Sequence, residues 1–417
     1  MDLFLPLLVL LVATRVVGEL AARLGQPRLV GEIVAGLALG LAARSGLALH
    51  LPVLAELGHS RPVELVAELG VFFMILDAGI DAHARELVQN SRTAIAAAVG
   101  GMGIPLFGGI ALTWLWLPEP HLAPALAVGV ALSTTAVPVT ARVLGGLGLT
   151  HSRMGQVVIS AAVVDDVLGL VALGLLTSLL ETGSVPTAGA MTVLVAKVGV
   201  FFALATLLGV FVEDRLDQLL NREHTVEGAL SSLLITATLF AVLAESLGMH
   251  FIMGPFLAGV FFEPARFGQD LYIRVGRTVR RVSEGFLAPV FFASIGLQLD
   301  LAAMQAIPGF LVLLVGFAFL GKLLGAGVPA RLGGLGPRES LGVGISMCAR
   351  GAVGLIVCDV AQRAGAFDGT DEVSRNLFSA VVLTAIVTTV LAPVLLRTVV
   401  GGLVGHGGAP DAGASGS

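Results

Sequence analysis

Long apolar segments, separated by short polar connections, follow one another along almost the whole chain of 417 residues. A helix needs about 20 mostly apolar residues to cross a bilayer, and most of these segments approach that length. The apolar residues run continuously instead of alternating, which favours helices over a β-barrel. Only 13% of the residues are charged, against roughly 25% in average globular domains. The sequence therefore predicts a membrane protein with many spans.

Thirteen apolar segments are candidate membrane-spanning helices. They cover residues 3–18, 27–43, 62–80, 93–117, 123–145, 154–180, 187–212, 226–247, 250–264, 283–298, 304–330, 339–361 and 376–400. We expect one all-α transmembrane domain over residues 1–404. The Gly-, Ala- and Ser-rich residues 405–417 predict a disordered cytoplasmic tail. No basic segment precedes the first apolar run, so we expect no cleaved signal peptide.

Arginines are distributed unevenly between alternate connections. Sixteen lie on one side of the predicted membrane and four on the other. Because short cytoplasmic connections carry an excess of basic residues, the richer side is expected to be cytoplasmic. The N-terminus is then outside and the C-terminus inside.

Three short sequence matches recur in the same order in the two halves of the chain. Gly31–Gly36 resembles Gly254–Gly259, Phe72-Phe73 resembles Phe291-Phe292, and Val128-Gly129 resembles Val343-Gly344, at offsets of 223, 219 and 215 residues. Corresponding helices are seven apart, an odd number, so they must cross the membrane in opposite directions. This predicts two inverted five-helix repeats, at about 27–180 and 250–402. Inverted repeats are typical of secondary transporters, whose substrate sites lie near the bilayer midplane at discontinuous helices.

Two neighbouring acids, Asp165 and Asp166, lie near the centre of the segment 154–180. A charge at the bilayer centre costs about 2.5–3.5 kcal/mol on insertion scales, so such residues are usually functional. Adjacent carboxylates also repel each other, which couples their titrations. The pair predicts a site that holds protons or a cation in turn. The alternative is a pair of polar groups satisfied by neighbouring helices.

The two lysines of the chain, Lys197 and Lys322, both lie inside apolar segments. Lys322 is close to the centre of 304–330, where we expect an ion pair with Asp165 or Asp166 that breaks when a cation arrives. The alternative is that its long side chain extends to the membrane surface. Lys197 is similarly deep in 187–212 but outside both repeats, so a structural and a functional role remain equally open.

Corresponding segments of the two repeats contain residues that interrupt helices. In the first, Pro138 lacks an N–H and follows the hydroxyl-bearing run Ser133-Thr134-Thr135. In the second, Arg350-Gly351 lies in the middle of the segment. We expect two unwound segments that cross near the midplane, with acids at the positive helix ends and Arg350 or Lys322 at the negative ends. The alternative for Pro138 is a simple proline kink.

Several further acids lie in apolar surroundings. Glu32, Glu68 and Asp77 are expected to be partners of Arg350 or to line an access funnel. Asp359 is near a helix end, where we expect it to be solvated.

Other functional classes lack their signatures. The eight histidines lie in or near connections without metal-ligand spacing, and no nucleotide-binding motif or catalytic nucleophile motif occurs. The net charge of −5 gives no reason to expect a nucleic-acid partner. We therefore expect no enzyme activity, no cofactor and no ATP hydrolysis by this chain.

The interrupted and charged motifs together resemble a known family. They are Val30–Gly36, Ser133–Thr140, Val164–Asp166, Gly254–Gly259, Phe291-Phe292 and Ala349–Gly351. These motifs are most similar to the cation:proton antiporter-2 family of bacterial sodium/hydrogen exchangers, over nearly the whole chain. The resemblance implies the sodium/proton antiporter fold, a homodimer in the bacterial inner membrane, and a mobile core with crossed helices. It also implies that Asp166 is the main ligand of a transient Na+, and that Asp165 and Lys322 form the ion pair of the electrogenic subgroup.

The resemblance implies exchange of Na+ for protons by alternating access. The same carboxylate and hydroxyl oxygens suit K+ or Li+, because no residue near them distinguishes these ions. A sodium-coupled symporter of an organic anion stays open as well, since Arg350 and Lys197 would suit an anion. A passive channel is disfavoured, because buried compensating charges indicate a stepwise cycle. Potassium-efflux relatives carry a cytoplasmic nucleotide-binding domain, which we do not expect in this chain.

Overall fold

The structure is a computed structural model. It describes residues 4–44, 61–81, 91–117, 121–135, 144, 149, 152–182, 196–197, 199–208, 225–247, 250–301, 303–369 and 371–400. Within these ranges all regular structure is helical and no strand occurs. Pro138, where a kink or an unwound segment is predicted, lies outside the described residues.

Six described helices are long and apolar enough to cross a membrane. They are α1 (Phe4–Arg23), α5 (Ser91–Trp116), α8 (Arg153–Thr182), α10 (Val226–Ser246), α16 (Pro308–Leu332) and α19 (Glu372–Val400). The remaining labelled elements are α2 (Arg28–Arg44), α4 (Arg61–Asp81), α6 (Leu122–Ser133), α11 (Met253–Phe261), α12 (Pro264–Phe267), α13 (Gln269–Val282), the π-helical turn η3 (Ser283–Leu287), α14 (Ala288–Gln298), α15 (Ala303–Ala306), α17 (Pro337–Ser346) and α18 (Ala352–Arg363). A further short apolar helix covers Gly199–Leu208.

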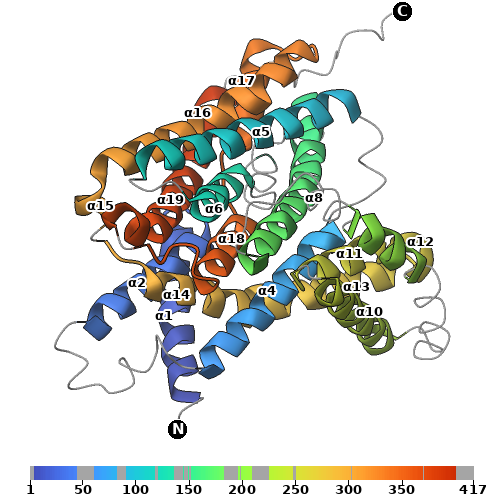
Figure 1. Ribbon diagram of the computed structural model, residues 1–417. Coiled ribbons are helices and arrows are strands. Elements are labelled where there is room, and N and C mark those ends of the chain that lie inside the picture. Colours follow the sequence, from blue (N-terminus) through green and yellow to red (C-terminus); the bar gives the residue numbers. More distant parts are fainter. Residues whose placement is uncertain are drawn as a thin grey trace, which may run out of the picture.

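The helices form two groups, which we call the upper and the lower group after their places in Figure 1. In the upper group, α5 and α16 run side by side, and α6, α8, α17, α18 and α19 pack with them (Figure 1). In the lower group, α1, α2 and α14 pack together, and α4 contacts α11, α13 and α14. The two groups meet where α4 contacts α18 and where α2 contacts α19. These contacts form the boundary between the two groups.

Small residues bring α5 and α16 into backbone contact. A methyl group added at Gly100 would lie 2.2 Å from the carbonyl oxygen of Gly325, and one added at Gly325 would lie 2.3 Å from that of Gly100. Side chains larger than hydrogen would therefore push the helices apart. Gly325 is one helical turn after Lys322, so this close contact also fixes the position of the buried lysine.

Most of the polar stretch between the predicted spans 250–264 and 283–298 is helical. α13 continues through η3 into α14, giving one helical run over residues 269–298. The arginines of α13 make its sequence too polar to be recognised in a search for apolar segments. Leu271, Tyr272, Val275 and Val279 are nevertheless buried at helical spacing, so α13 packs one face against the protein.

Both segments that were expected to be interrupted end a helix early. α6 ends at Ser133, and Thr134 has extended backbone angles of φ −73° and ψ 153°. In the second segment α17 ends at Ser346 and α18 begins at Ala352, with non-helical residues between them. α6 packs against α18. A methyl group at Gly354 would lie 2.4 Å from Thr134 Oγ1, so glycine permits this crossing.

Candidate ion-binding site

A buried ion pair lies at the centre of the upper group. The Nζ atom of Lys322 on α16 lies 3.1 Å from both carboxylate oxygens of Asp165 on α8. The side chain of Lys322 is 0% exposed and that of Asp165 is 1% exposed. Lys322 therefore does not extend to the membrane surface. Removing either partner of such a pair would leave an uncompensated buried charge.

Thr135 connects this ion pair to both helix interruptions. Lys322 donates a hydrogen bond of 2.7 Å to Thr135 Oγ1, two residues after the end of α6. Thr135 Oγ1 in turn donates to the carbonyl oxygen of Met347, at 3.3 Å. Met347 caps the C-terminal end of α17. Movement at either interruption would therefore be transmitted to the lysine.

The neighbouring hydroxyls have a more local role. Ser133 Oγ donates to the carbonyl oxygen of Val130 at 2.7 Å, and Thr134 Oγ1 donates to that of Ala131 at 3.1 Å. Both bonds satisfy carbonyl groups in the last turn of α6, which have few partners at a helix end. The structure thus brings Thr135 to the ion pair, whereas the hydroxyls of Ser133 and Thr134 bond to their own helix.

Asp166 is beside the ion pair but not part of it. It is 9% exposed. Within the described part of the chain, no hydrogen bond or ion pair of its carboxylate is resolved. Of the two neighbouring acids, Asp165 is therefore the one that bonds to Lys322.

Arg350 neutralises the C-terminal end of α6. Its guanidinium donates to the carbonyl oxygens of Ala131 at 3.3 Å, of Thr134 at 3.4 Å and of Leu132. It also donates to the carbonyl oxygen of Ala318 on α16, at 3.2 Å. The negative end of a helix dipole favours such a cation. Of the two cations expected to fill this role, the structure therefore places Arg350 directly on the carbonyl groups.

Gly351 directly follows Arg350 and is the N-cap residue of α18, with an extended backbone. The stretch from Met347 to Gly351 therefore combines the end of one helix with the start of the next. Helix ends of opposite sign meet here, close to the ion pair, which is the arrangement expected for an ion site at discontinuous helices.

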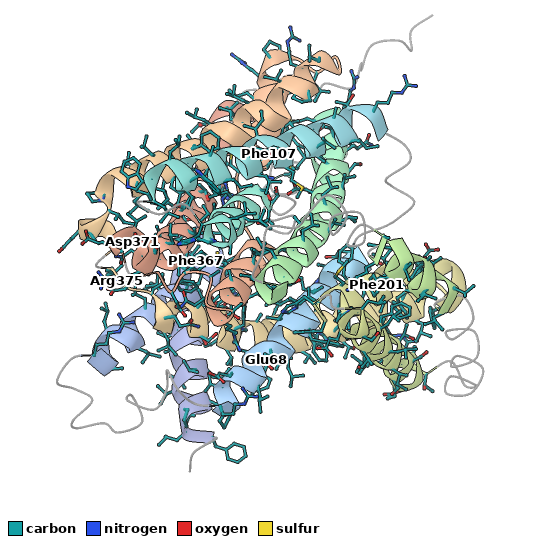
Figure 2. The ribbon with its side chains drawn as sticks, viewed as in Figure 1. Glu68, Phe107, Phe201, Phe367, Asp371 and Arg375 are labelled. Carbon is teal, nitrogen blue, oxygen red and sulfur yellow. The ribbon has the colours of Figure 1, made fainter. Side chains whose placement is uncertain are left out.

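A cavity of about 480 Å³ lies where α4, α8 and α18 meet, at the boundary between the two groups. Its wall includes Glu68, whose position on α4 below α18 is labelled in Figure 2. Arg363 Nη1 lies 3.0 Å from Glu68 Oε1, and Arg363 Nε lies 2.9 Å from Asp359 Oδ2. Glu68 thus lines a cavity but does not pair with Arg350. Asp359 is buried with 8% of its side chain exposed, so the expectation that it is solvated was wrong.

Asp77 also has a partner other than Arg350. Arg280 on α13 donates to both of its oxygens, at 3.1 and 3.2 Å, and to Asp81. These bonds hold the end of α4 against α13. Glu32 is buried on α2 beside Gly18 of α1. Within the described residues Arg350 pairs with none of these acids, because its guanidinium donates to backbone carbonyl groups. Their other expected role, lining an access funnel, stays a prediction.

The side chain of Lys197 is exposed on the surface of the protein. The following short helix likewise exposes Val200, Leu204 and Leu207. These side chains lie on an outward face of the protein, so Lys197 takes no part in the central cluster.

Three residues of these networks were not identified from the sequence. Arg363 had a usable signal, since it follows Asp359 by four residues on one helix face. Arg280 was one of several arginines in a presumed connection. Thr389, whose hydroxyl bonds to the backbone of Arg350, had no signal beyond being a hydroxyl in a long apolar helix.

Comparisons with known proteins identify the family of the chain. The chain matches the family model of the sodium/hydrogen exchanger transmembrane domain over residues 7–401. It is 28% identical over 396 residues to the Na(+)/H(+)-K(+) antiporter GerN of Bacillus cereus, covering 95% of this chain and 96% of GerN. It is 27% identical to the high-affinity Na(+)/H(+) antiporter NhaS3 of Synechocystis sp., covering 95% of this chain and 89% of NhaS3.

A solved structure extends the similarity to the fold. The sodium proton antiporter MjNhaP1 from Methanocaldococcus jannaschii aligns with a TM-score of 0.70 and 19% identity, over 97% of this chain and 98% of MjNhaP1. Discontinuous helices that meet beside buried charges are typical of secondary transporters, the class of membrane protein to which this fold points. The family match is more specific: the chain belongs to the sodium/hydrogen exchanger family.

Proposed function

We propose that the protein exchanges a monovalent cation, most readily Na+, for protons across a bacterial inner membrane. The observation that carries this proposal is the buried pair of Lys322 and Asp165 beside Asp166, whose carboxylate has no ion pair within the described part of the chain. The choice of Na+ and protons as the exchanged ions is supported by the names of two relatives, since GerN and NhaS3 are both named as Na+/H+ antiporters.

In the proposed cycle, a cation from the cytoplasm reaches Asp166, displaces protons and disrupts the bond between Lys322 and Asp165. A buried charge is costly to move through a low-dielectric region, so the bound cation lowers the barrier by neutralising the carboxylates. The upper group then shifts past the lower group, and the cation leaves outside. Protons reload the site for the return.

The second acid gives a reason for electrogenic exchange. If Asp166 and the Lys322–Asp165 pair each carry a proton, two protons enter for each cation that leaves. One net charge then moves inward in each cycle, which is worth about 2.3 kcal/mol per 100 mV of membrane potential. The membrane potential would thus drive extrusion of the cation.

The finer architecture belongs to the same proposal. It consists of thirteen spans, inverted repeats at about 27–180 and 250–402, an outside N-terminus, and a cytoplasmic tail at 405–417. The early end of α6 and the gap between α17 and α18 support the repeats, because they fall at corresponding positions. We assign the upper group to the mobile core and the lower group to the fixed part of a homodimer.

K+ exchange is the second candidate, because GerN is named as an antiporter of both ions. A symporter of an organic anion has less support. Among the described residues, Arg350 and Lys322 are both occupied by oxygen partners. Lys197 is exposed, away from that cluster. These positions leave little positive charge for an anion at the centre.

The test of ion specificity uses the purified protein in liposomes that contain a pH-sensitive dye. Addition of Na+ should produce a pH change, and parallel additions of Li+ and K+ rank the ions. Carboxylate oxygens can bind all three ions, so we expect selectivity to appear as a different exchange rate for each ion. No response to any of these ions, combined with Na+-dependent uptake of an organic anion, would contradict the proposal.

A further inference from the structure

The unwound segment between α17 and α18 receives support from a helix that sequence analysis did not connect with the site. The backbone N–H of Arg350 donates to Thr389 Oγ1 on α19, at 3.1 Å. The same hydroxyl donates to the backbone carbonyl oxygen of Arg350, at 2.9 Å. One side chain therefore satisfies both backbone groups of the residue at the break.

This arrangement is fully enclosed, with Thr389 1% exposed and Arg350 2% exposed. Backbone groups within a membrane protein have no water to replace a missing partner, so an unwound segment persists only where the protein supplies one. Without the hydroxyl, the segment would have to move until its N–H and C=O found other partners.

The other threonines in this part of α19 behave differently. Thr384 Oγ1 donates to the carbonyl oxygen of Ala380 at 2.8 Å, and Thr388 Oγ1 donates to that of Thr384 at 2.9 Å. Both bonds stay within α19, as is usual for hydroxyls in apolar helices. Thr389 instead bonds across to the interrupted segment, so its contact is not a general feature of threonine in this helix.

The backbone position of Arg350 determines what its side chain can reach. Its guanidinium donates to the last carbonyl groups of α6, including Thr134. The next residue, Thr135, accepts a hydrogen bond from Lys322, which pairs with Asp165. A continuous series of bonds thus leads from the hydroxyl of Thr389 to the ion pair.

We infer that Thr389 is a positioning residue for ion exchange. Its hydroxyl holds the unwound backbone at Arg350, and this keeps the positive charge of Arg350 on the end of α6 beside the acids. Thr389 does not contact the ion itself. The inference rests on the proposed exchange at Asp166 and adds a residue that controls the affinity of that site.

The test compares Thr389→Val, Thr389→Ser and the control Thr388→Val in liposomes. Valine keeps the shape of threonine but removes the hydroxyl, and serine keeps the hydroxyl. Loss of a buried hydrogen bond changes an equilibrium by roughly 5- to 100-fold. We expect Thr389→Val to raise the KM for Na+ by at least about fivefold and to shift the pH profile of exchange. Thr389→Ser and Thr388→Val should stay close to the unmodified protein.

A purely structural role would lower the yield or the maximal rate and leave the KM and the pH profile unchanged. That result for Thr389→Val would overturn the inference, as would a serine variant that behaves like the valine variant. If the valine variant does not fold, Thr389→Cys, with its weaker hydrogen bonds, should show an intermediate KM, and an unchanged KM there also overturns the inference. Exchange that persists in Asp166→Asn would instead reject the proposed function.

Discussion

Replacing Asp166 by asparagine should abolish Na+-driven proton exchange. Asn has almost the same shape as Asp but carries neither a negative charge nor a titratable proton. Losing one partner of a buried charge interaction costs about 2–5 kcal/mol, or roughly 30- to 5000-fold in binding. The fold should survive, because no described side chain depends on the Asp166 carboxylate for a bond.

The measurement is the pH change inside dye-loaded liposomes after a pulse of Na+. Asp270→Asn on α13 is the matched control, since it makes the same chemical change outside the central cluster. Asp270 is 81% exposed in its ion pair with Arg274, and exposed pairs contribute little, so this variant should retain exchange. Equal activity of Asp166→Asn and the unmodified protein would exclude Asp166 as the ion site.

Replacing Lys322 by alanine should have the second largest effect. The variant leaves Asp165 buried without a partner, which costs about 3–5 kcal/mol when the acid stays charged. Asp165 can avoid this cost by keeping a proton throughout the cycle. The pair would then no longer release a second proton, so any remaining exchange should be insensitive to membrane potential.

This prediction has two readouts. The first is the exchange rate under an imposed potential, which should change in the unmodified protein and stay constant in Lys322→Ala. The second is thermal unfolding in detergent, where Lys322→Ala/Asp165→Asn should recover part of the stability lost in the single variant. Potential-dependent exchange that survives Lys322→Ala unchanged would refute the role of the ion pair.

The central pair could be anticipated from the sequence because charged residues in apolar segments are costly. Asp165, Asp166 and Lys322 stand out for this reason, and the energetic penalty limits the explanations for their presence. The sequence left open which acid bonds to the lysine. That choice depends on how α8 and α16 are rotated about their axes, which the surrounding packing determines.

The partners of the other charges could not be predicted for a related reason. Arg350 was matched with distant acids, but the carbonyl groups of α6 are closer and also need donors. Backbone groups carry no residue-specific signal, so a side chain that binds them has no recognisable partner in the sequence. Thr389 escaped notice for the same reason, because it bonds to the backbone of Arg350.

A search for apolar segments does not detect α13, because this helix is largely polar. Four arginines in fourteen residues make this helix resemble a polar connection, although its buried face is apolar. The same reasoning worked for α5, α8, α16 and α19, whose surroundings are apolar on most sides. Hydropathy thus detects long apolar helices, but it misses a polar helix such as α13 that continues directly into an apolar one.

The most direct test of the central claim is calorimetric titration of the purified protein with Na+ at several pH values and in buffers of different ionisation enthalpy. If protons and Na+ occupy the carboxylate of Asp166 in turn, the apparent affinity for Na+ falls as the pH is lowered, and Na+ binding releases protons. Asp166→Asn should show no such binding. Na+ binding that is independent of pH, releases no protons, and persists in Asp166→Asn would contradict the claim.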